Sequence, residues 1–431
     1  MKEKNKYYVT DKIPAEWRLV KLNEFIELIA SNVDKKKRKN QPTVLLCNYM
    51  DVYNNEYITD NISFMEASAS NTEIEKFSIK ENDVIITKDS ETKDDIANSS
   101  AVIKTMSNVL CGYHLALLRP KKQAFNNIYL SKLFNIRPVY SQLVNKANGT
   151  TRFGLTTGTI ENLIIPKPPL PEQQKIASIL STVDEKIENT DRQIEQTQNL
   201  KKGLMQRLLT RGIGHARFVS SPLGEIPESW EVDNLKSLLK YNPEYGASAS
   251  SIEMKDNCYR YIRITDITEN GKLIEENKVG ILKEKGEKYL LNEDDILIAR
   301  TGNSVGKSYI HNKKYGKCSF AGYLIRFIID NRKYTPKLLF YFLHSPYYYK
   351  WVKNTLRTGA QPNINSKEYQ SMLIPIPPLQ EQQKIASILS TFDEKLENLQ
   401  SKKSQYEQLK KGLMQKLLTG KMRVKVKENN T

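Results

Sequence analysis

The segment RTGNSVGKS at residues 300–308 contains residue types that bind phosphate groups. Glycine, lysine and serine after a strand-like run, here DDILIA at 294–299, are typical of a nucleotide-binding P-loop. A P-loop needs four residues between its first glycine and its Gly-Lys pair, but Gly302 and Gly306 enclose only three. It must also lead into a helix, whereas residues 309–317 lack helical periodicity. The sequence therefore argues against an ATPase and leaves a basic, hydroxyl-rich turn to be explained.

Two other segments approach catalytic motifs without completing them. YNPEY at 241–245 approaches the Asn-Pro-Pro-Tyr motif of amino-methyltransferases, but it lacks the second proline and no glycine-rich cofactor loop accompanies it. Asp83 with Glu91 and Lys93 imitates the carboxylate and lysine set of a nuclease, and the second half of the chain has no corresponding set. We therefore predict no catalytic residues.

The chain as a whole is basic. Its 431 residues include 66 Lys and Arg against 49 Asp and Glu, a formal net charge of +17. This excess indicates contact with nucleic acid, although a solvated lysine-rich surface gives the same count. The longest apolar run, at residues 338–343, is far shorter than the roughly 20 residues of a membrane span. With no hydrophobic signal at residues 1–10, we expect a cytoplasmic protein.

The four cysteines lie far apart in the sequence and have no metal-ligand spacing. We expect reduced, structural thiols and no metal site.

The strongest feature of the sequence is an internal repeat. Residues 172–210 return at 381–419 with a constant offset of 209 and no gap, and 27 of the 39 positions are identical. Shorter matches precede these tails and open each half of the chain: IPKPPLP (165–171) with IPIPPLQ (374–380), and IPAEW (13–17) with IPESW (226–230). The chain therefore has two halves, each a globular head followed by a shared tail.

Both tails carry the apolar spacing of a long coiled-coil helix. The seam residues are Ile176, Leu180, Val183, Ile187, Ile194, Leu204 and Leu208, and then Ile385, Leu389, Phe392, Leu396, Leu399, Leu413 and Leu417. Gly203 and Gly412 interrupt these helices, each at a cost of about 1 kcal/mol relative to alanine. Close approach of another backbone, a kink and simple inheritance through the duplication all remain open for these glycines.

The relative direction of the two tails follows from their length. A helix of 39 residues is about 58 Å long, whereas a head the size of residues 213–379 has a radius of gyration of about 15 Å. Parallel helices would force that head to begin and end about 58 Å apart. We therefore predict an antiparallel coiled-coil pair of long helices with pseudo-two-fold symmetry.

The heads are predicted to be mixed α/β regions at opposite ends of this helix pair, which makes the fold class α/β (α+β). The expected elements are strands at 84–87 and 296–299 and shorter helices near 129–146 and 336–353. The predicted boundaries are 1–170 for the first head, 171–212 for the central helix, 213–379 for the second head, 380–420 for the C-terminal helix and 421–431 for a basic tail. Beyond anchors such as CGYHLALL (111–118) beside AGYLIRFI (321–328), the heads share little sequence. A constant frame with two divergent surfaces suits the reading of two different targets.

The doubled pattern IP-x-PPL-x-EQQKIASIL, followed by a helix that ends LKKGLMQ(R/K)LLT, resembles the specificity subunit of type I restriction-modification systems. The resemblance covers essentially the whole chain. It implies that the heads are target recognition domains, each reading one half of a bipartite DNA sequence, and that the helices separate them and hold methyltransferase subunits. It also implies a non-catalytic chain. S-adenosylmethionine would belong to the modification subunits, two of which are expected, and ATP and Mg²⁺ to the restriction subunits.

With this resemblance, the basic turns that follow the strands become candidate DNA contacts. Lys, Arg, hydroxyl groups and backbone N–H groups suit phosphates, while neighbouring side chains reach base edges; a surface hairpin with incidental lysines is the alternative. A second loop, RTGAQPNIN at 357–365, matches the family's pattern, whereas GTTRFGLTTG at 149–158 lacks Gln-Pro-Asn. The candidate DNA-binding residues are Lys88, Arg152, Arg300, Thr301, Asn303, Ser304, Lys307, Arg357, Thr358, Gln361 and Asn363. Tyr113 and Tyr323, which follow the paired glycines, are predicted to pack in the core.

Two alternatives of other classes stay open. One is a single-chain DNA methyltransferase or restriction enzyme with unrecognised catalytic motifs, and the other is a coiled-coil protein that binds no DNA.

Overall fold

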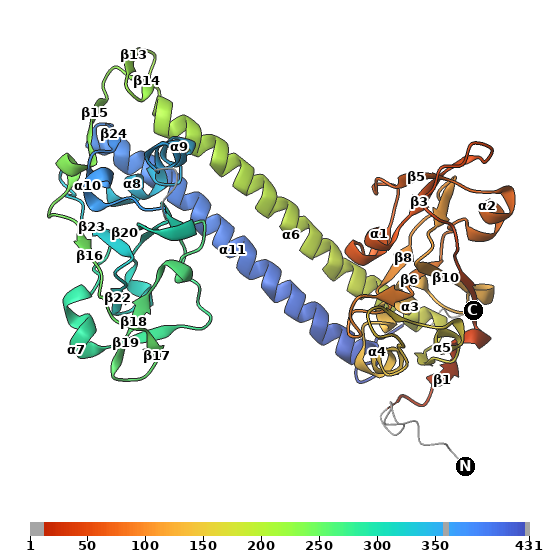
Figure 1. The fold of residues 1–431 in the computed structure, drawn as a ribbon. Helices are drawn as coiled ribbons and strands as arrows, with labels where there is room; N and C mark the ends of the chain where they lie inside the picture. Colours follow the sequence, from red (N-terminus) through yellow and green to blue (C-terminus); the bar gives the residue numbers. More distant parts are fainter. Residues whose placement is uncertain (1–12, 357–361, 427–431) are drawn as a thin grey trace. The chain divides into compact units, whose positions relative to one another are not determined.

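The computed structural model describes residues 13–356 and 362–426. The chain divides into two compact units, a first unit of residues 1–191 and 401–431 and a second unit of residues 192–400. Two long helices, α6 (Leu170–Arg211) and α11 (Leu379–Leu417), each contribute one half to each unit (Figure 1). Each unit therefore consists of one head and an antiparallel pair of helix halves.

The head of the first unit contains two main sheets. One has five strands in the order β2 (Ile26–Ala30), β10 (Leu115–Pro120), β6 (Val84–Thr87), β8 (Ser99–Val102) and β4 (Tyr57–Ile58); the other has β5 (Met65–Ser68), β3 (Thr43–Cys47) and β9 (Val109–Cys111). Two short pairs are β1 (Arg18–Lys21) with β12 (Ile164–Lys167), and β7 (Asp89–Ser90) with β11 (Phe153–Gly154). The helices are α1 (Tyr49–Asn54), α2 (Asn71–Phe77), α3 (Asn127–Leu133), α4 (Arg137–Val144) and α5 (Thr157–Glu161).

The head of the second unit contains two four-stranded sheets. Their orders are β16 (Glu244–Tyr245), β23 (Leu324–Phe327), β20 (Ile296–Ala299) and β21 (Ser308–Ile310), and β17 (Ile252–Glu253), β19 (Val279–Leu282), β18 (Cys258–Ile262) and β22 (Cys318–Phe320). The short pairs are β13 (Phe218–Ser221) with β14 (Gly224–Pro227), and β15 (Glu231–Asn234) with β24 (Leu373–Ile376). The helices are α7 (Lys283–Gly286), α8 (Pro336–Phe342), α9 (Pro346–Thr355) and α10 (Ser366–Gln370). The predicted mixed α/β heads are thus confirmed.

The predicted strands at 84–87 and 296–299 are β6 and β20. Both are rich in β-branched residues, with the sequences VIIT and ILIA, and are buried along their whole length, as expected of strands at the centre of a sheet. The shorter helices near 129–146 and 336–353 are each resolved into two, because a turn separates α3 from α4 and another separates α8 from α9.

The two heads share one framework although their sequences diverge. β10 pairs antiparallel with β6 in the first head, and β23 pairs antiparallel with β20 in the second. A parallel pair recurs as well, β3 with β9 and β18 with β22. The registers place Thr87 opposite Leu115 and Ala299 opposite Leu324. Leu115 is therefore equivalent to Leu324. An alignment of Gly112-Tyr113 with Gly322-Tyr323 would instead place Leu115 beside Ile325, so that alignment is wrong by one residue.

Within each unit the two long helices run antiparallel. Ion pairs join them at Lys410–Asp184 and Lys403–Asp191 in the first unit, both at 2.7 Å, and at Lys201–Asp393 in the second, at 2.5 Å. Residue numbers fall along α11 as they rise along α6, which confirms the predicted antiparallel pair. Every predicted seam residue is buried or half-buried.

Each long helix is tied to its head by the glutamate that begins the repeat. Glu172 accepts a hydrogen bond from Trp17 Nε1 at 2.9 Å, and the equivalent Glu381 accepts one from Trp230 Nε1 at 3.0 Å. The tryptophans come from the shared IPAEW and IPESW stretches, so these matches in the sequence correspond to one contact made twice.

The glycines within the long helices have room around them. A Cβ atom added at Gly203 or at Gly412 would meet no neighbouring atom within 4 Å, and both helices continue through these positions. Of the three explanations left open, close approach of a second backbone is therefore excluded, and the structure agrees with simple inheritance through the duplication.

The four cysteines are free and buried, as predicted. Cys47 and Cys111 lie opposite each other on the parallel strands β3 and β9. Burial raises the pKa of both thiols, and it raises the pKa of Cys318 to about 11, so these groups are protonated and unreactive at neutral pH.

Candidate nucleic-acid interface

In the second head, the candidate interface begins at Arg300, the residue that follows β20. Its backbone N–H donates to the carbonyl of Tyr323 at 3.0 Å, and its own carbonyl accepts from the N–H of Ile364 at 2.9 Å. Arg300 is therefore held between the turn before β23 and the loop before α10. Its guanidinium carbon lies 4.8 Å from the centre of the Tyr245 ring, an arrangement that orients an arginine without neutralising it.

Tyr245 is itself fixed by the loop before α10. Its hydroxyl is 3.2 Å from the Ser366 hydroxyl and accepts from the Ser366 N–H at 3.2 Å. Burial alone raises the pKa of Tyr245, but these hydrogen bonds and the nearby Arg300 charge lower it overall. The arginine and the tyrosine thus form one positioned pair.

The turn after Arg300 is closed by the same loop. Thr301 forms a β-bridge with Asn363, and Gly302 N–H donates to the Pro362 carbonyl at 3.0 Å. Asn303 and Asn363 are exposed, whereas Ser304 is half-buried. The structure therefore brings the two predicted loops together in the second head.

Gly306 allows the tight turn between β20 and β21. Gly306 has φ of +87°, and a Cβ there would lie 3.1 Å from Val352, so the turn needs glycine. Lys307 leads into the strand β21 (Ser308–Ile310) and not into a helix, and its ammonium pairs with Glu269 at 2.7 Å. The rejection of a P-loop is confirmed, and Lys307 is already neutralised within the head.

The first head repeats this backbone arrangement with other side chains. Lys88 follows β6; its N–H donates to the His114 carbonyl and its carbonyl accepts from Leu155 N–H, at 2.9 and 2.8 Å. The Lys88 side chain turns inward, however, because Nζ donates to the Ser31 carbonyl at 3.1 Å and lies 5.6 Å from the Tyr113 ring centre. Burial lowers the pKa of this ammonium below its usual range.

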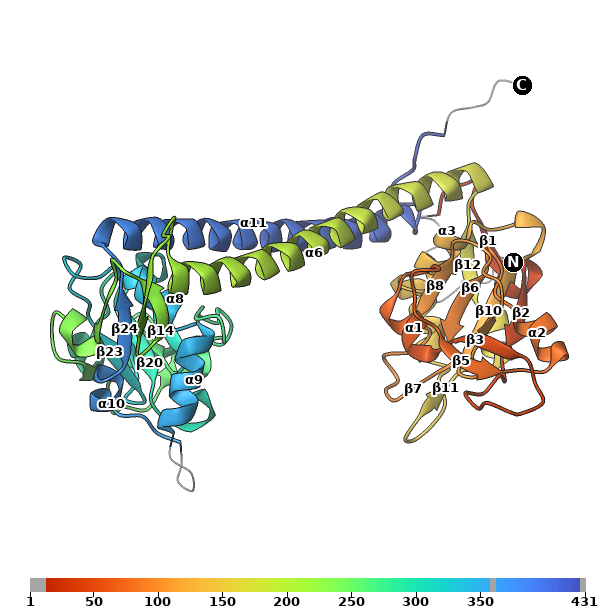
Figure 2. The ribbon, with the colours of Figure 1, turned by 90° about the horizontal axis from the view of Figure 1, so that it is seen from above.

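Asp89 positions two other groups of the first head. Its carboxylate contacts His114 Nδ1 at 2.7 Å and Arg152 at 3.0 Å. The Arg152 side chain is 56% exposed, so it presents a guanidinium that the carboxylate orients from one side. Arg152 precedes β11, which pairs with β7 on the side of the first head away from α6 (Figure 2).

Tyr113 and Tyr323 are exposed, at 54% and 59%, so the prediction that they pack in the core is wrong. Both lie in the turns that lead into the central strands β10 and β23, where side chains face solvent. Because Leu115 is equivalent to Leu324, the residue equivalent to Tyr323 is His114. Exposed aromatic groups beside Lys88 and Arg300 suit nucleic-acid contact.

Three of the predicted residues, Arg357, Thr358 and Gln361, lie outside the described residues. Sequence reasoning missed Asp89, His114, Tyr245 and Tyr323. Only Asp89 could have been found from the sequence, because it directly follows the predicted residue Lys88. The contacts that hold the other three span dozens of residues in the sequence.

Asp83, which with Glu91 and Lys93 imitates a nuclease, has a structural role. Its carboxylate is 1% exposed and pairs with Arg119 at 2.8 Å. Glu91 and Lys93 are exposed. In the part of the chain that the structure describes, no group of three His, Cys, Asp or Glu side chains is arranged to hold a metal ion.

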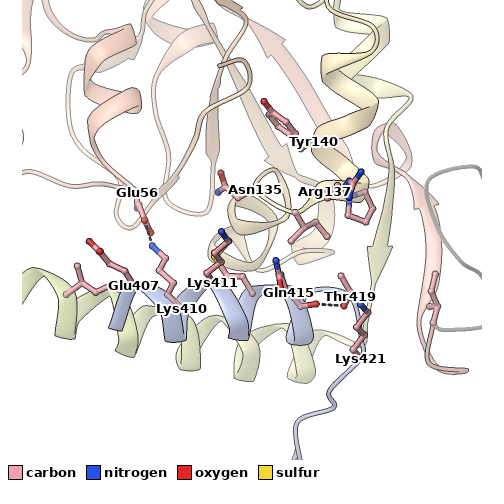
Figure 3. A pocket seen from close by; sticks show the side chains of 15 residues that line it. Glu56, Asn135, Arg137, Tyr140, Glu407, Lys410, Lys411, Gln415, Thr419 and Lys421 are labelled. Atoms are coloured by element: carbon pink, nitrogen blue, oxygen red, sulfur yellow. Dashed lines mark hydrogen bonds and ion pairs between the residues drawn. The ribbon is translucent and has the colours of Figure 1, made fainter. Parts of the chain in front are cut away.

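Each unit also has a groove between its helix pair and its head. In the first unit it has a volume of about 930 Å³, and Figure 3 shows α11 and the start of α4 on its two sides. The second groove measures about 850 Å³. Lys410, Lys411 and Met414 line the first groove, and Lys201, Lys202 and Met205 line the second. These residues are 209 apart, so the duplication made the two helix walls alike.

The comparison with known families matches both halves of the chain. The model described as "Type I restriction modification DNA specificity domain" matches residues 14–198 and 227–408. The chain belongs to this family. It is 29% identical over 425 residues to the type I restriction enzyme MjaVIII specificity subunit of Methanocaldococcus jannaschii, a match that covers 96% of this chain and 95% of the relative. It is 22% identical over 383 residues to the StySPI specificity subunit of Salmonella potsdam, covering 87% and 81%.

Solved structures of the family share the fold. The S subunit of a type I restriction-modification system from M. genitalium has a TM-score of 0.59 at 16% identity, covering 95% of this chain and 98% of that one. A chain from a study of complex assembly and conformational transition in the type I R-M system has a TM-score of 0.54 at 18% identity, covering 95% and 99%.

No helix within residues 13–356 and 362–426 is both long enough and apolar enough to cross a membrane.

Proposed function

We propose that this chain is the DNA sequence-specificity subunit of a type I restriction-modification complex, in which each head reads one half of a bipartite DNA site. The observation that carries the proposal is the match of both halves with one specificity-domain family. The shared framework supports it, because equivalent positions at the end of the central sheet carry different side chains. His114 stands where the second head has Tyr323. Since bases differ in the donors and acceptors at their edges, one frame with different side chains suits two different half-sites.

The proposed interface is the end of the central sheet in each head. In the second head it consists of Arg300 with its partner Tyr245, Thr301, Asn303 and Asn363. In the first head it consists of Arg152 with Asp89 and His114, whereas the Lys88 side chain turns inward. A charged or amide side chain held by a second group is well placed to contact a base edge or a phosphate.

The chain has no catalytic role in this proposal. Adenine methylation would use S-adenosylmethionine bound by modification subunits, and translocation and cleavage would use ATP and Mg²⁺ bound by restriction subunits. We place the complete complex in the cytoplasm, where its DNA substrate is.

The decisive experiment mixes the purified chain with DNA and S-adenosylmethionine, with and without modification subunits. We expect methylation of a bipartite site only when both proteins are present. Methylation by the chain alone would establish the single-chain methyltransferase instead, and DNA methylation that never depended on the chain would refute the proposal.

We further propose that two modification subunits dock on the surfaces that the repeat makes alike, including the two grooves. Lys202 and Lys411 are equivalent exposed residues on the helix walls of the grooves. Two like surfaces suit two copies of one partner, whereas the heads offer two different surfaces.

Charge reversal separates these surfaces from the rest of the helices. Lys202→Glu and Lys411→Glu should each remove one modification subunit, and the double variant should remove both, as measured from the mass of the complex. Arg207→Glu and Lys416→Glu are the matched controls, because these exposed helix residues do not line the grooves. Full occupancy in the double variant would exclude the grooves from docking.

A further inference from the structure

The seam between the long helices contains lysines where its spacing calls for apolar residues. Steps of seven residues from Leu180 reach Lys201 in α6, and the same steps from Leu389 reach Lys403 and Lys410 in α11. Leucine is the usual residue at such positions. Lys201 and Lys410 are 209 residues apart, so the same exception occurs at the same place in both repeats.

In the first unit, the exceptional lysine joins a buried polar cluster. Lys410 Nζ pairs with Asp184 of α6 at 2.7 Å, and their side chains are 16% and 9% exposed. Asp184 also binds Lys132 Nζ of α3 at 2.6 Å and accepts from the Tyr57 hydroxyl of β4 at 2.5 Å. Glu56 contacts both lysines, and Figure 3 shows its bond to Lys410. One carboxylate thus connects both long helices to the head.

The second unit builds the same joint from equivalent residues. Asp393 of α11, equivalent to Asp184, pairs with Lys201 of α6 at 2.5 Å, and this pair is only partly buried, with side chains 30% and 21% exposed. It also accepts a hydrogen bond from the Tyr341 hydroxyl of α8 at 2.7 Å. Tyr341 is 209 residues after Lys132, so the head contributes from the same helix position in both units, although the residue type has changed.

Stability alone does not explain these clusters. Removing two charges from water costs several kcal/mol per ion, and well-packed apolar residues in place of a buried ion pair are often neutral or stabilising. Apolar packing tolerates small rotations and shifts, whereas an ion pair with a hydrogen bond holds one geometry. An ion pair with a hydrogen bond at this joint is therefore better suited to orienting the head than to stabilising it.

We propose that Asp184 and Asp393 are positioning residues that fix the orientation of each head on the helix pair, and through it the number of base pairs allowed between the two half-sites. The inference rests on the proposed function. In this inference, the helix length sets the gap between the half-sites, and the two joints between head and helices keep that gap from varying.

The test replaces the joint of the second unit with apolar residues. The triple variant Lys201→Leu, Asp393→Leu and Tyr341→Phe removes the ion pair and also the hydroxyl that would lose its acceptor. With modification subunits present, the variant methylates a DNA library in which the gap between half-sites varies, and sequencing gives the gap at each methylated site. We expect the same bases in both half-sites, while the preference for the native gap over gaps one base pair longer or shorter falls by about fivefold to tenfold, the effect of losing about 1 to 1.4 kcal/mol of discrimination.

A matched control removes an ion pair that touches no head. Lys403 and Asp191 join the two helices at 2.7 Å, and the double variant Lys403→Leu and Asp191→Leu should keep the native gap preference. The single variant Asp393→Asn keeps the size of the side chain and can still accept from Tyr341, so its loss of preference should be intermediate.

The outcomes separate this inference from the proposed function. If the native chain directs methylation to a bipartite site and the triple variant keeps the native gap preference, the positioning role is refuted and the function stands. A triple variant that unfolds more readily than the native chain would also refute it, because the joint would then serve stability. If the native chain directs no site-specific methylation, the proposed function itself fails.

Discussion

The repeated motif Glu-Gln-Gln has a specific task at the level of single residues. Its first member bonds the shared tryptophan in each head, and its second member ties the helix start to the head backbone. Gln173 accepts from Asn126 N–H at 3.0 Å and donates to the Pro168 carbonyl at 2.9 Å. Gln382 makes the same two contacts, with Thr335 N–H and the Pro377 carbonyl, both at 2.8 Å. The junction between head and helix therefore repeats these contacts in both units, while the reading surface is free to vary.

Arg300 is the sharpest test of the reading surface. Arg300→Ala should weaken DNA binding; if Arg300 meets a phosphate, the slope of log K against log salt should also fall by about one unit. If it reads guanine, the loss should depend on the base and amount to roughly 1 to 3 kcal/mol. Binding titrations over a range of salt concentrations, with the native site and with single-base variants, distinguish the two cases.

Arg332→Ala is the control for Arg300, because Arg332 lies in the same head, is 87% exposed and pairs with Asp330. Binding that stays unchanged at every salt concentration in Arg300→Ala would remove this turn from the interface.

His311 gives the second head a predicted dependence of stability on pH. Its side chain is 3% exposed, and burial lowers its pKa, with Arg260 acting in the same direction and Glu293 and the Gly316 backbone opposing it. The unfolded chain, with a histidine pKa of about 6.5, then binds the proton more readily than the folded chain. The stabilisation is present above about pH 6.5 and is lost as the pH falls through the lower folded-state pKa.

Urea denaturation at pH 7.5 and 5.5 checks this expectation. The native chain should lose stability at the lower pH, and His311→Asn, which cannot titrate in this range, should lose less. Equal losses in the two proteins would assign the acid sensitivity to other groups.

At the level of elements, the long helices were predictable and the equivalence of the heads was not. A heptad pattern is local, so α6 and α11 follow directly from residue spacing, and their antiparallel direction follows from length. The match of Gly112-Tyr113 with Gly322-Tyr323 was off by one residue, because the shared Gly-Tyr pair has an offset of 210, whereas strand pairing makes Leu115 equivalent to Leu324 at the offset of 209 seen in the tails.

The candidate interface was only partly predictable for the same reason. Arg300 and Asn363 were found because they belong to recognisable loops. Lys88 looked like their counterpart, yet its ammonium bonds the carbonyl of Ser31, 57 residues away. Tyr245 reaches Arg300 from a separate edge strand. Contacts between segments so far apart depend on the folded sheet.

The two helix glycines yield a stability prediction. Gly203→Ala and Gly412→Ala should each stabilise the protein by about 0.5 to 1 kcal/mol, because alanine loses less backbone entropy on folding and finds open space at both positions. Thermal and urea denaturation measure the change. Gly306→Ala is the opposing control and should destabilise, since its φ is +87° and Val352 is 3.1 Å from the added Cβ. A loss of stability in Gly203→Ala or Gly412→Ala would mean that these glycines have a structural role.

For the whole molecule, specificity has two components: the first is the choice of bases in each half-site, and the second is the distance between the half-sites. Under the proposed function, divergent heads determine which bases are read, and a shared helix pair with similar junctions determines where each head is held. Under the proposed function, substitutions of residues such as Arg300 would alter the first component. The second component depends on the length of α6 and α11 and on the two carboxylate joints.

The length of the helices makes its own prediction. One heptad of helix rises about 10 Å, and DNA rises about 3.4 Å per base pair, so seven residues added to both helices should lengthen the gap between half-sites by up to about 3 base pairs. We would insert the heptads after Gln196 and after Gln405, in the more polar middle of each helix, and map the methylated sites by sequencing.

An insertion of four residues is the control for this experiment. A heptad preserves the seam, whereas four residues shift the apolar positions out of register and should impair folding or subunit docking. Tilt between the helices and the DNA axis would make the added gap smaller than 3 base pairs but not zero. An active heptad variant with the native gap would show that helix length does not set the distance, and the spacing would then have to come from the heads and their joints alone.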